Sequence, residues 1–279
     1  MKHISICLVI ILLATMVTGV FTAHAENASN TAEQISCNSA EYFATYGAST
    51  FTEKTETVAY TNRTEQSRSV ALLAPIYVIS GVTCVPNAGT TVLGFYDIAY
   101  PDLIPNFTAG TIIYGMYSYY KPTSYVTTAA LQLAKDMGLN NPATDGASVS
   151  NFKTGMQTYC QRKGLNISFQ GCISSGSINY TQVKENINNI TPLVVFTSKF
   201  NLTLINTQNN TDTVHSYIST DTHAMFVYGY TEYTYTLSNG QTKTYRYLQV
   251  STGIGFLDSA LVNIDADILI DDAYAVTIY

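Results

Sequence analysis

The strongest constraint on the fold is a long β-hairpin expected near the C-terminus. Two runs rich in Tyr, Thr and apolar residues, 224–235 and 242–251, flank the pair Asn239-Gly240. Asn-Gly between two such runs is typical of a tight turn that joins antiparallel strands. The sequence therefore predicts antiparallel pairing in the C-terminal half of the chain.

Helical patterns precede the hairpin, because apolar residues recur there at spacings of three and four. Helices are expected at 84–100, 122–137, 149–163 and 182–190, and further strands at 52–60, 70–79, 192–197 and 273–279. Helices that come first and antiparallel strands that come later predict the α+β class.

The first 25 residues have the order of a secretory signal peptide. A basic start is followed by the apolar run 4–21 and by Ala23-His24-Ala25, a small-x-small cleavage site. We expect cleavage after Ala25 and a protein that is secreted, extracellular or held at the cell envelope. An uncleaved anchor is the alternative, since the apolar run is just long enough to span a bilayer. No integral membrane segment is expected after cleavage.

The rest of the chain is long enough for one large domain with its own core. Residues 26–69 are expected to be either an N-terminal lead, a removable pro-segment or a part of the fold, and residues 70–279 the domain. Charged residues make up 11% of the chain, its formal net charge is −6, and no cluster of Lys and Arg stands out. Nucleic acid is therefore not an expected partner.

Four cysteines remain after the signal, and two interpretations of them stay open. An even number in an exported protein favours two disulfides, of which Cys160–Cys172 is the most plausible and Cys37–Cys84 the remainder. The alternative leaves Cys84 free and reactive. Cys84 opens a predicted helix, where the peptide dipoles favour a thiolate and free N–H groups can hold an oxyanion.

A cysteine nucleophile also needs a base within hydrogen-bonding reach. The chain after the signal offers only His215 and His223. His215 lies in a polar run and is expected at the surface. His223 begins an apolar strand beside the small Ala224, so that its ring can point into a cleft. An ordinary, partly buried histidine is the alternative.

The stretch Cys84-Val85-Pro86-Asn87-Ala88 and the helix after it resemble the nucleophile helix of papain-like cysteine peptidases. The closest likeness is to the bacteriocin-processing-peptidase-like branch and related bacterial cysteine peptidases. HAMFVYGY and YRYLQVSTGIG resemble the strand of the catalytic histidine and the strand of the third catalytic group. The resemblance covers residues 70–257 and implies a papain-like fold, with a helical lobe that carries the nucleophile helix, followed by an antiparallel β lobe.

The resemblance implies that Cys84 attacks a carbonyl carbon of a peptide or protein substrate. His223 would take the thiol proton and later protonate the leaving amine. The family's third group is Asn or Asp, whereas the matching stretch here offers Ser251 first and Thr252 next. A Gln that donates to the oxyanion in the family is absent from residues 77–81.

Two alternatives to a secreted peptidase follow from these departures. The same fold without catalysis would be a peptide-binding or surface-interaction module. A disulfide-built structural protein would instead use both cysteine pairs as bridges.

No cofactor or metal is expected. Two histidines and scattered cysteines lack the spacing of a zinc site. Four aspartates near the C-terminus lack the glycine and the terminal glutamate of a calcium-binding loop, so a solvated face is expected there. They are Asp265, Asp267, Asp271 and Asp272.

Overall fold

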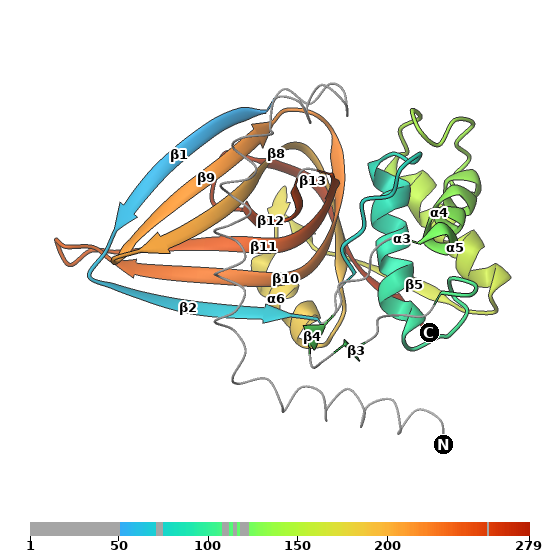
Figure 1. Cartoon of the computed structure of the whole chain (residues 1–279), viewed down its shortest axis with the longest axis horizontal. Coiled ribbons are helices and arrows are strands. Elements are labelled where there is room, and N and C mark those ends of the chain that lie inside the picture. Colours follow the sequence, from blue (N-terminus) through green and yellow to red (C-terminus); the bar gives the residue numbers. More distant parts are fainter. Residues whose placement is uncertain (1–50, 71–74, 108–111, 114–115, 118–122, 256) are drawn as a thin grey trace, which may run out of the picture.

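The computed structural model describes residues 51–70, 75–107, 112–113, 116–117, 123–255 and 257–279. A nine-stranded antiparallel sheet dominates it, and three helices pack at one end of this sheet (Figure 1). These three helices are α3 (Cys84–Asp97), α4 (Ser124–Asp136) and α5 (Val149–Arg162), and a fourth described helix, α6 (Tyr180–Asn188), packs against β10 and β2. The strands of the sheet are β1 (Thr52–Ala59), β2 (Asn62–Ser69), β5 (Ile167–Gly171), β8 (Leu193–Gln208), β9 (Thr211–Ser219), β10 (His223–Thr236), β11 (Thr242–Ile254), β12 (Leu257–Asn263) and β13 (Leu269–Ile278). Two small hairpins are β3 (Ile112–Ile113) with β4 (Met116–Tyr117) and β6 (Ile173–Ser174) with β7 (Ser177–Ile178).

The sheet is curved because β8 changes partners along its length. Its first part, 193–197, pairs with the start of β10, 223–227. Its later part pairs with β9 and, at one position, with β12. Since β12 pairs with β11 and β11 with β10, these four strands form a closed circuit of pairings. β13 adds to the first part of β8 and carries β5.

The sheet begins and ends with strands from one short segment. β1 pairs with β9 and β2 pairs with β10, and these two strands stand at opposite ends of the strand order. They converge where Tyr60 and Thr61 link them, which gives the sheet a tapered end (Figure 1). The Tyr60 N–H donates to the Asn210 carbonyl and the Thr61 N–H to the Thr236 carbonyl, so the link joins two hairpin tips.

A buried carboxylate holds the tapered end together. Asp212 on β9 forms an ion pair with Arg63 on β2 at 2.7 Å, and the Asp212 side chain is fully buried. The Tyr235 hydroxyl donates to the same carboxylate at 2.6 Å. Thr207 and Tyr60 also donate to it. One acidic group therefore receives hydrogen bonds from several strands at once.

Helix α3 is the central helix of the molecule, because it lies between the sheet and the other two helices of this end (Figure 1). Nearly all of its residues are buried, whereas the sequence predicts one buried face. The hydroxyls of Thr90 and Thr91 donate to carbonyls one turn earlier in the helix, which allows them to be buried. Gly89 lets α4 and α5 approach closely, since a Cβ there would lie 2.8 Å from a methyl of Leu133.

The expected helices and the expected hairpin are present, with shifted ends. β10 and β11 are joined through Asn239-Gly240, and Gly240 has φ of 77°. The positive φ of Gly164, 73°, follows α5 as a left-handed stop. Of the strand expected over residues 70–79, the described residues 70 and 75–79 are irregular, and residues 71–74 lie outside the described residues. β2 and β9 were not expected at all.

The expected architecture of a papain-like helical lobe followed by an antiparallel β lobe is wrong. The structure is 45% strand and 24% helix, and its helices pack around one end of a large sheet. The sequence underestimates the sheet because some of its strands, β9 among them, are rich in polar residues. Residues 198–222 look like a polar loop in the sequence, yet they complete β8 and form β9. Their buried positions include polar side chains, Thr203, Asp212 and Ser219 among them, which hide the apolar alternation of a strand.

Only part of the N-terminal region can be compared with the expectations from the sequence. Residues 1–50, which include the expected signal peptide, cleavage site and Cys37, lie outside the described residues. Residues 52–59 and 62–69 of the expected lead are strands β1 and β2 of the main sheet. Among the described helices, none combines the length and the apolar character needed to cross a membrane.

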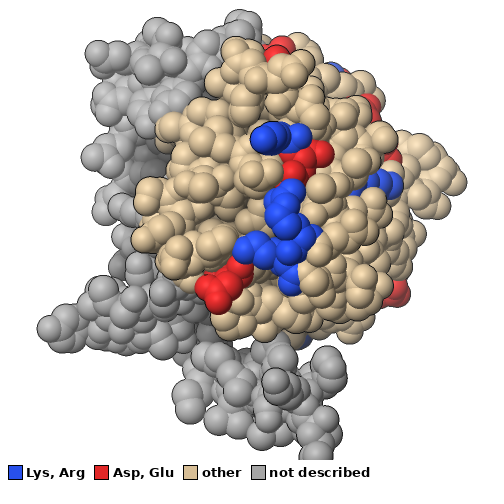
Figure 2. Space-filling model, turned by 90° about the vertical axis from the view of Figure 1, so that its right-hand side faces the viewer, with Lys and Arg blue, Asp and Glu red and all other residues tan. Residues whose placement is uncertain are grey.

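The surface is mostly uncharged, as the composition indicates. Figure 2 views the end of the molecule that carries α3, α4 and α5, and Lys and Arg gather there in one short stripe with acidic side chains beside it. Part of this charge is paired, since Arg162 at the end of α5 forms an ion pair with Asp136 of α4. Uncharged residues cover most of the rest of the described surface on this face, with a few further charged side chains towards its edges.

Candidate active site

The structure places Cys84 at the first position of α3, with a free and partly buried thiol. The residue before the helix, Thr83, does not cap it. Instead its hydroxyl donates to the Asp145 carbonyl and its N–H to the Pro142 carbonyl. The first N–H groups of α3 are therefore not consumed by a capping side chain, and the positive end of the helix dipole faces the sulfur.

His223 lies at the first position of β10 and is brought to Cys84 from the other side of the site. The two side chains lie close enough for each to shift the pKa of the other. The ring also stacks on Phe200 of β8, with centroids 5.1 Å apart and an angle of 25° between the planes. The register of β10 on β8 sets this placement, because His223 stands opposite Thr197. The structure thus brings together the two residues that the sequence singled out.

The pKa values of the two groups move in opposite directions. Burial alone would raise the pKa of the Cys84 thiol, but the hydrogen bond and the charge of His223 lower it below its ordinary value. Backbone N–H groups of Ala224 and of Cys84 itself act in the same direction. Burial alone would lower the pKa of His223, whereas the hydrogen bond and the charge of Cys84 raise it. These shifts favour a thiolate beside an imidazolium.

A main-chain carbonyl occupies the far side of the imidazole. His223 Nε2 lies 2.7 Å from the Thr252 oxygen. A carbonyl can only accept, so Nε2 carries hydrogen and donates, which leaves Nδ1 for Cys84. Ser251, the first choice from the sequence, does not take this position. Its Oγ is buried and has no hydrogen-bond partner among the described residues.

The turn that presents this carbonyl is held by its own residues. The Thr252 hydroxyl accepts from the Ile254 N–H at 2.9 Å and donates to the Leu257 carbonyl. Gly253 follows with φ of 70°, and a Cβ there would lie 2.7 Å from Nδ2 of Asn87. Only glycine fits this position without displacing the Asn87 side chain.

Asn87 connects the nucleophile helix to the segment before it. Its buried carboxamide accepts from the Ile79 N–H at 2.9 Å and donates to the Tyr77 carbonyl at 3.0 Å. The sequence singled out neither Asn87 nor the Thr252 carbonyl as a functional group. A glycine inside a strand pattern, Gly253, was the available signal, because it indicates a close approach of the backbone to another group.

The disulfide interpretation is not supported for the described cysteines. Cys84, Cys160 and Cys172 all carry free thiols. Burial raises the pKa of Cys160 to about 12 and also raises the pKa of Cys172. Cys84 is therefore the described thiol with the greatest thiolate character at neutral pH.

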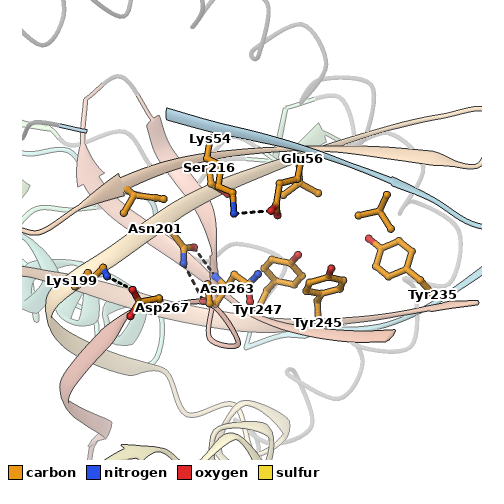
Figure 3. A pocket seen from close by; sticks show the side chains of 14 residues that line it. Lys54, Glu56, Lys199, Asn201, Ser216, Tyr235, Tyr245, Tyr247, Asn263 and Asp267 are labelled. Carbon is orange, nitrogen blue, oxygen red and sulfur yellow. Dashed lines mark hydrogen bonds and ion pairs between the residues drawn. The ribbon is translucent and has the colours of Figure 1, made fainter. Parts of the chain in front are cut away.

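A second concave region lies away from the dyad, on the inner face of the curved sheet (Figure 3). It has a volume of about 300 Å³, and β1, β8, β9 and β11 contribute to its walls. Its charges pair within the wall, as Lys54 with Glu56 and Lys199 with Asp267. Its lining residues include neither Cys nor His, so it offers no nucleophile of the kind found at Cys84.

The described residues contain no group of three or more metal-binding side chains placed to hold an ion. All four C-terminal aspartates are engaged with other side chains, Asp265 with Arg246, Asp267 with Lys199, Asp271 with Ser198 and Asp272 with Tyr274.

Comparisons with protein families, with curated proteins and with solved structures each found no match to this chain. The functional interpretation therefore depends on the site itself.

Proposed function

We propose that this protein is an exported cysteine peptidase that hydrolyses peptide bonds through a thioester on Cys84. The observation that carries the proposal is the placement of His223 beside Cys84, two residues far apart in the sequence that shift each other's pKa. The thiol lies at a helix N-terminus, and the imidazole is oriented by a hydrogen bond from its Nε2 to the Thr252 carbonyl. This combination activates a sulfur nucleophile. The resemblance of the Cys84 segment to cysteine peptidases supports the same chemistry.

In the first half of the reaction, His223 holds the thiol proton at Nδ1 while Cys84 Sγ bonds to the carbonyl carbon of the substrate. The negative charge that develops on the carbonyl oxygen is stabilised by N–H groups at the start of α3. The imidazolium then gives its proton to the amide nitrogen, the C–N bond breaks and the amine product leaves.

In the second half, a water molecule replaces the amine. His223 takes one proton from this water as its oxygen bonds to the thioester carbon. The C–S bond then breaks, the carboxylic acid product leaves, and the proton returns to the sulfur. The enzyme is restored with no net change in atoms or charge.

A second candidate function is a peptide-binding module that has lost catalysis. Two observations favour it: no side-chain amide or carboxylate bonds the imidazole in the described structure, and Ser251 Oγ has no partner there. In this case Cys84 need not be more reactive than an ordinary thiol.

The test is the alkylation rate of Cys84 by iodoacetamide as a function of pH, mapped by mass spectrometry, followed by hydrolysis of a mixed peptide library. We expect labelling of Cys84 well below the ordinary thiol pKa of about 8.5 and loss of this low-pH labelling in His223→Ala. Hydrolysis should cease in Cys84→Ala.

Controls are present in the same chain. His215→Ala removes the other histidine of the described region, which lies on β9 and bonds Thr55, and should leave labelling unchanged. Cys160 should stay unlabelled at neutral pH because it is buried. Low-pH labelling without hydrolysis of any peptide favours the binding module. A Cys84 that titrates like a free thiol in both proteins contradicts the peptidase.

A further inference from the structure

The imidazole of His223 is oriented by a main-chain carbonyl. The third group of the site therefore need not be a side chain. Cysteine and serine nucleophiles commonly rely on a side chain that accepts from the far ring nitrogen of the base. Here the acceptor within hydrogen-bonding distance is the Thr252 carbonyl, 2.7 Å from Nε2. Thr252 is fully buried, so solvent does not compete for this bond.

The direction of the bond follows from the chemistry of the acceptor. The carbonyl cannot donate, so Nε2–H is required in the neutral ring and in the imidazolium alike. This selects the neutral tautomer whose Nδ1 has a free lone pair, and that lone pair faces the thiol. The carbonyl oxygen also carries partial negative charge, which stabilises the imidazolium that forms when Cys84 loses its proton.

A carbonyl can act in this way only if the turn that carries it is rigid. The Thr252 side chain provides this, because its hydroxyl bridges the Ile254 N–H and the Leu257 carbonyl across the turn. Gly253 then presses the turn against Asn87 of the nucleophile helix. The carbonyl is therefore fixed relative to α3, which carries the thiol, as well as relative to the strand that carries His223.

We propose that Thr252 is the positioning residue of this site: its carbonyl fixes the His223 tautomer, and its hydroxyl holds that carbonyl in place. The inference rests on the proposed function, since it assigns a role in activating Cys84. The group that accepts from His223 Nε2 is then the Thr252 carbonyl and not the Ser251 side chain. Ser251 is then expected to be dispensable.

The experiment compares Thr252→Val, which keeps the shape but removes the hydroxyl, with Thr252→Ser, which keeps the hydroxyl. The readout is the pH profile of Cys84 alkylation. We expect the labelling rate at pH 6 to fall about tenfold or more in Thr252→Val, because the midpoint moves towards that of a free thiol. Thr252→Ser and the matched control Ser251→Ala should stay within about twofold of the unmodified protein.

A second measurement needs no variant, which covers the case in which Thr252→Val fails to fold. Nitrogen-15 NMR of the histidine-labelled protein, with Cys84 blocked by methylthiolation so that the ring titrates alone, reports which ring nitrogen of His223 carries hydrogen. The Nε2–H tautomer is expected. The Nδ1–H tautomer, or a Ser251→Ala profile that matches Thr252→Val, would overturn the inference. Neither readout requires hydrolysis, so an unreactive Cys84 in the unmodified protein would count against the proposed function instead.

Discussion

The two ends of the sheet are built by different means, although β10 runs through both. At the dyad end, formed by residues 193–197 and 223–227 with α3, the strands are apolar and almost entirely buried. At the tapered end, formed by β1, β2, β9 and the later parts of β10 and β11, polar and tyrosine side chains take over and Asp212 is the shared acceptor. Burial positions Cys84 and His223, whereas hydrogen bonds and an ion pair to Asp212 hold the far end together.

The comparison predicts that chemistry and stability can be separated by mutation. Chemistry should depend on the dyad end alone, and a large part of the stability of the tapered end should depend on one carboxylate. The four predictions below test this separation, beginning with the largest expected effect.

Cys84→Ala should abolish peptide hydrolysis, with a loss on the order of a thousandfold or more, because the acyl-enzyme cannot form. His223→Ala should have a comparable effect on hydrolysis. Thermal unfolding of Cys84→Ala should remain close to that of the unmodified protein, because the change removes only a partly buried sulfur. A Cys84→Ala protein that still hydrolyses peptides would assign the chemistry to another site.

Asp212→Ala should lower the free energy of unfolding by about 3–5 kcal/mol, because it leaves Arg63 and two tyrosine hydroxyls without their acceptor. Urea unfolding followed by tyrosine fluorescence measures the change. Asp212→Asn keeps the shape and one acceptor oxygen, so it should cost less. In both variants the low-pH alkylation of Cys84 should persist. Loss of that reactivity would show that the two ends are coupled.

The pH dependence of Cys84 labelling should show the sign of both pKa shifts. The pKa of Cys84 is lowered and that of His223 is raised, and both shifts favour the pair of thiolate and imidazolium over the neutral pair. Labelling should therefore rise at a pH below about 8.5 and exceed that of a free thiol by about tenfold at pH 7. In Asp212→Asn the same profile is expected, since the two groups lie at different ends.

Glu56→Gln should change the free energy of unfolding by less than about 1 kcal/mol. Its partner Lys54 lies on the same strand, and both side chains are more than half exposed. This surface pair borders the cavity of Figure 3. A cost close to that of Asp212→Ala would show that exposed pairs also hold the tapered end, which would weaken the comparison.

The sequence predicts the apolar dyad end of the sheet better than the polar tapered end. The apolar spacing after Cys84 and the Asn239-Gly240 turn predicted α3 and the β10–β11 hairpin, because local patterns encode both. β9 was missed because its buried positions include the polar Asp212, whose partners Arg63 and Tyr235 lie on other strands and are not revealed by a local pattern. The predicted helical lobe failed for a related reason, since the extent of the sheet was underestimated.

The candidate site was predictable in its side chains and not in its main chain. Cys84 and His223 could be named because few residue types perform such chemistry. The Thr252 carbonyl could not, since every residue has a carbonyl and only the folded turn selects one. Ser251 matches the family's third group by its side chain, yet its Oγ finds no partner among the described residues, and the Thr252 carbonyl accepts from the imidazole instead.

The placement of β1 and β2 has a consequence for aggregation. These strands cover the outer edges of β9 and β10, and their own side chains are largely polar, charged and exposed. Charged terminal strands discourage other chains from pairing edge to edge. Loss of β1 would expose the edge of β9, and further trimming through β2 would expose the tyrosine-rich edge of β10 to neighbouring molecules. Proteolytic removal of the N-terminal region should therefore preserve a soluble protein only if the cut falls before β1.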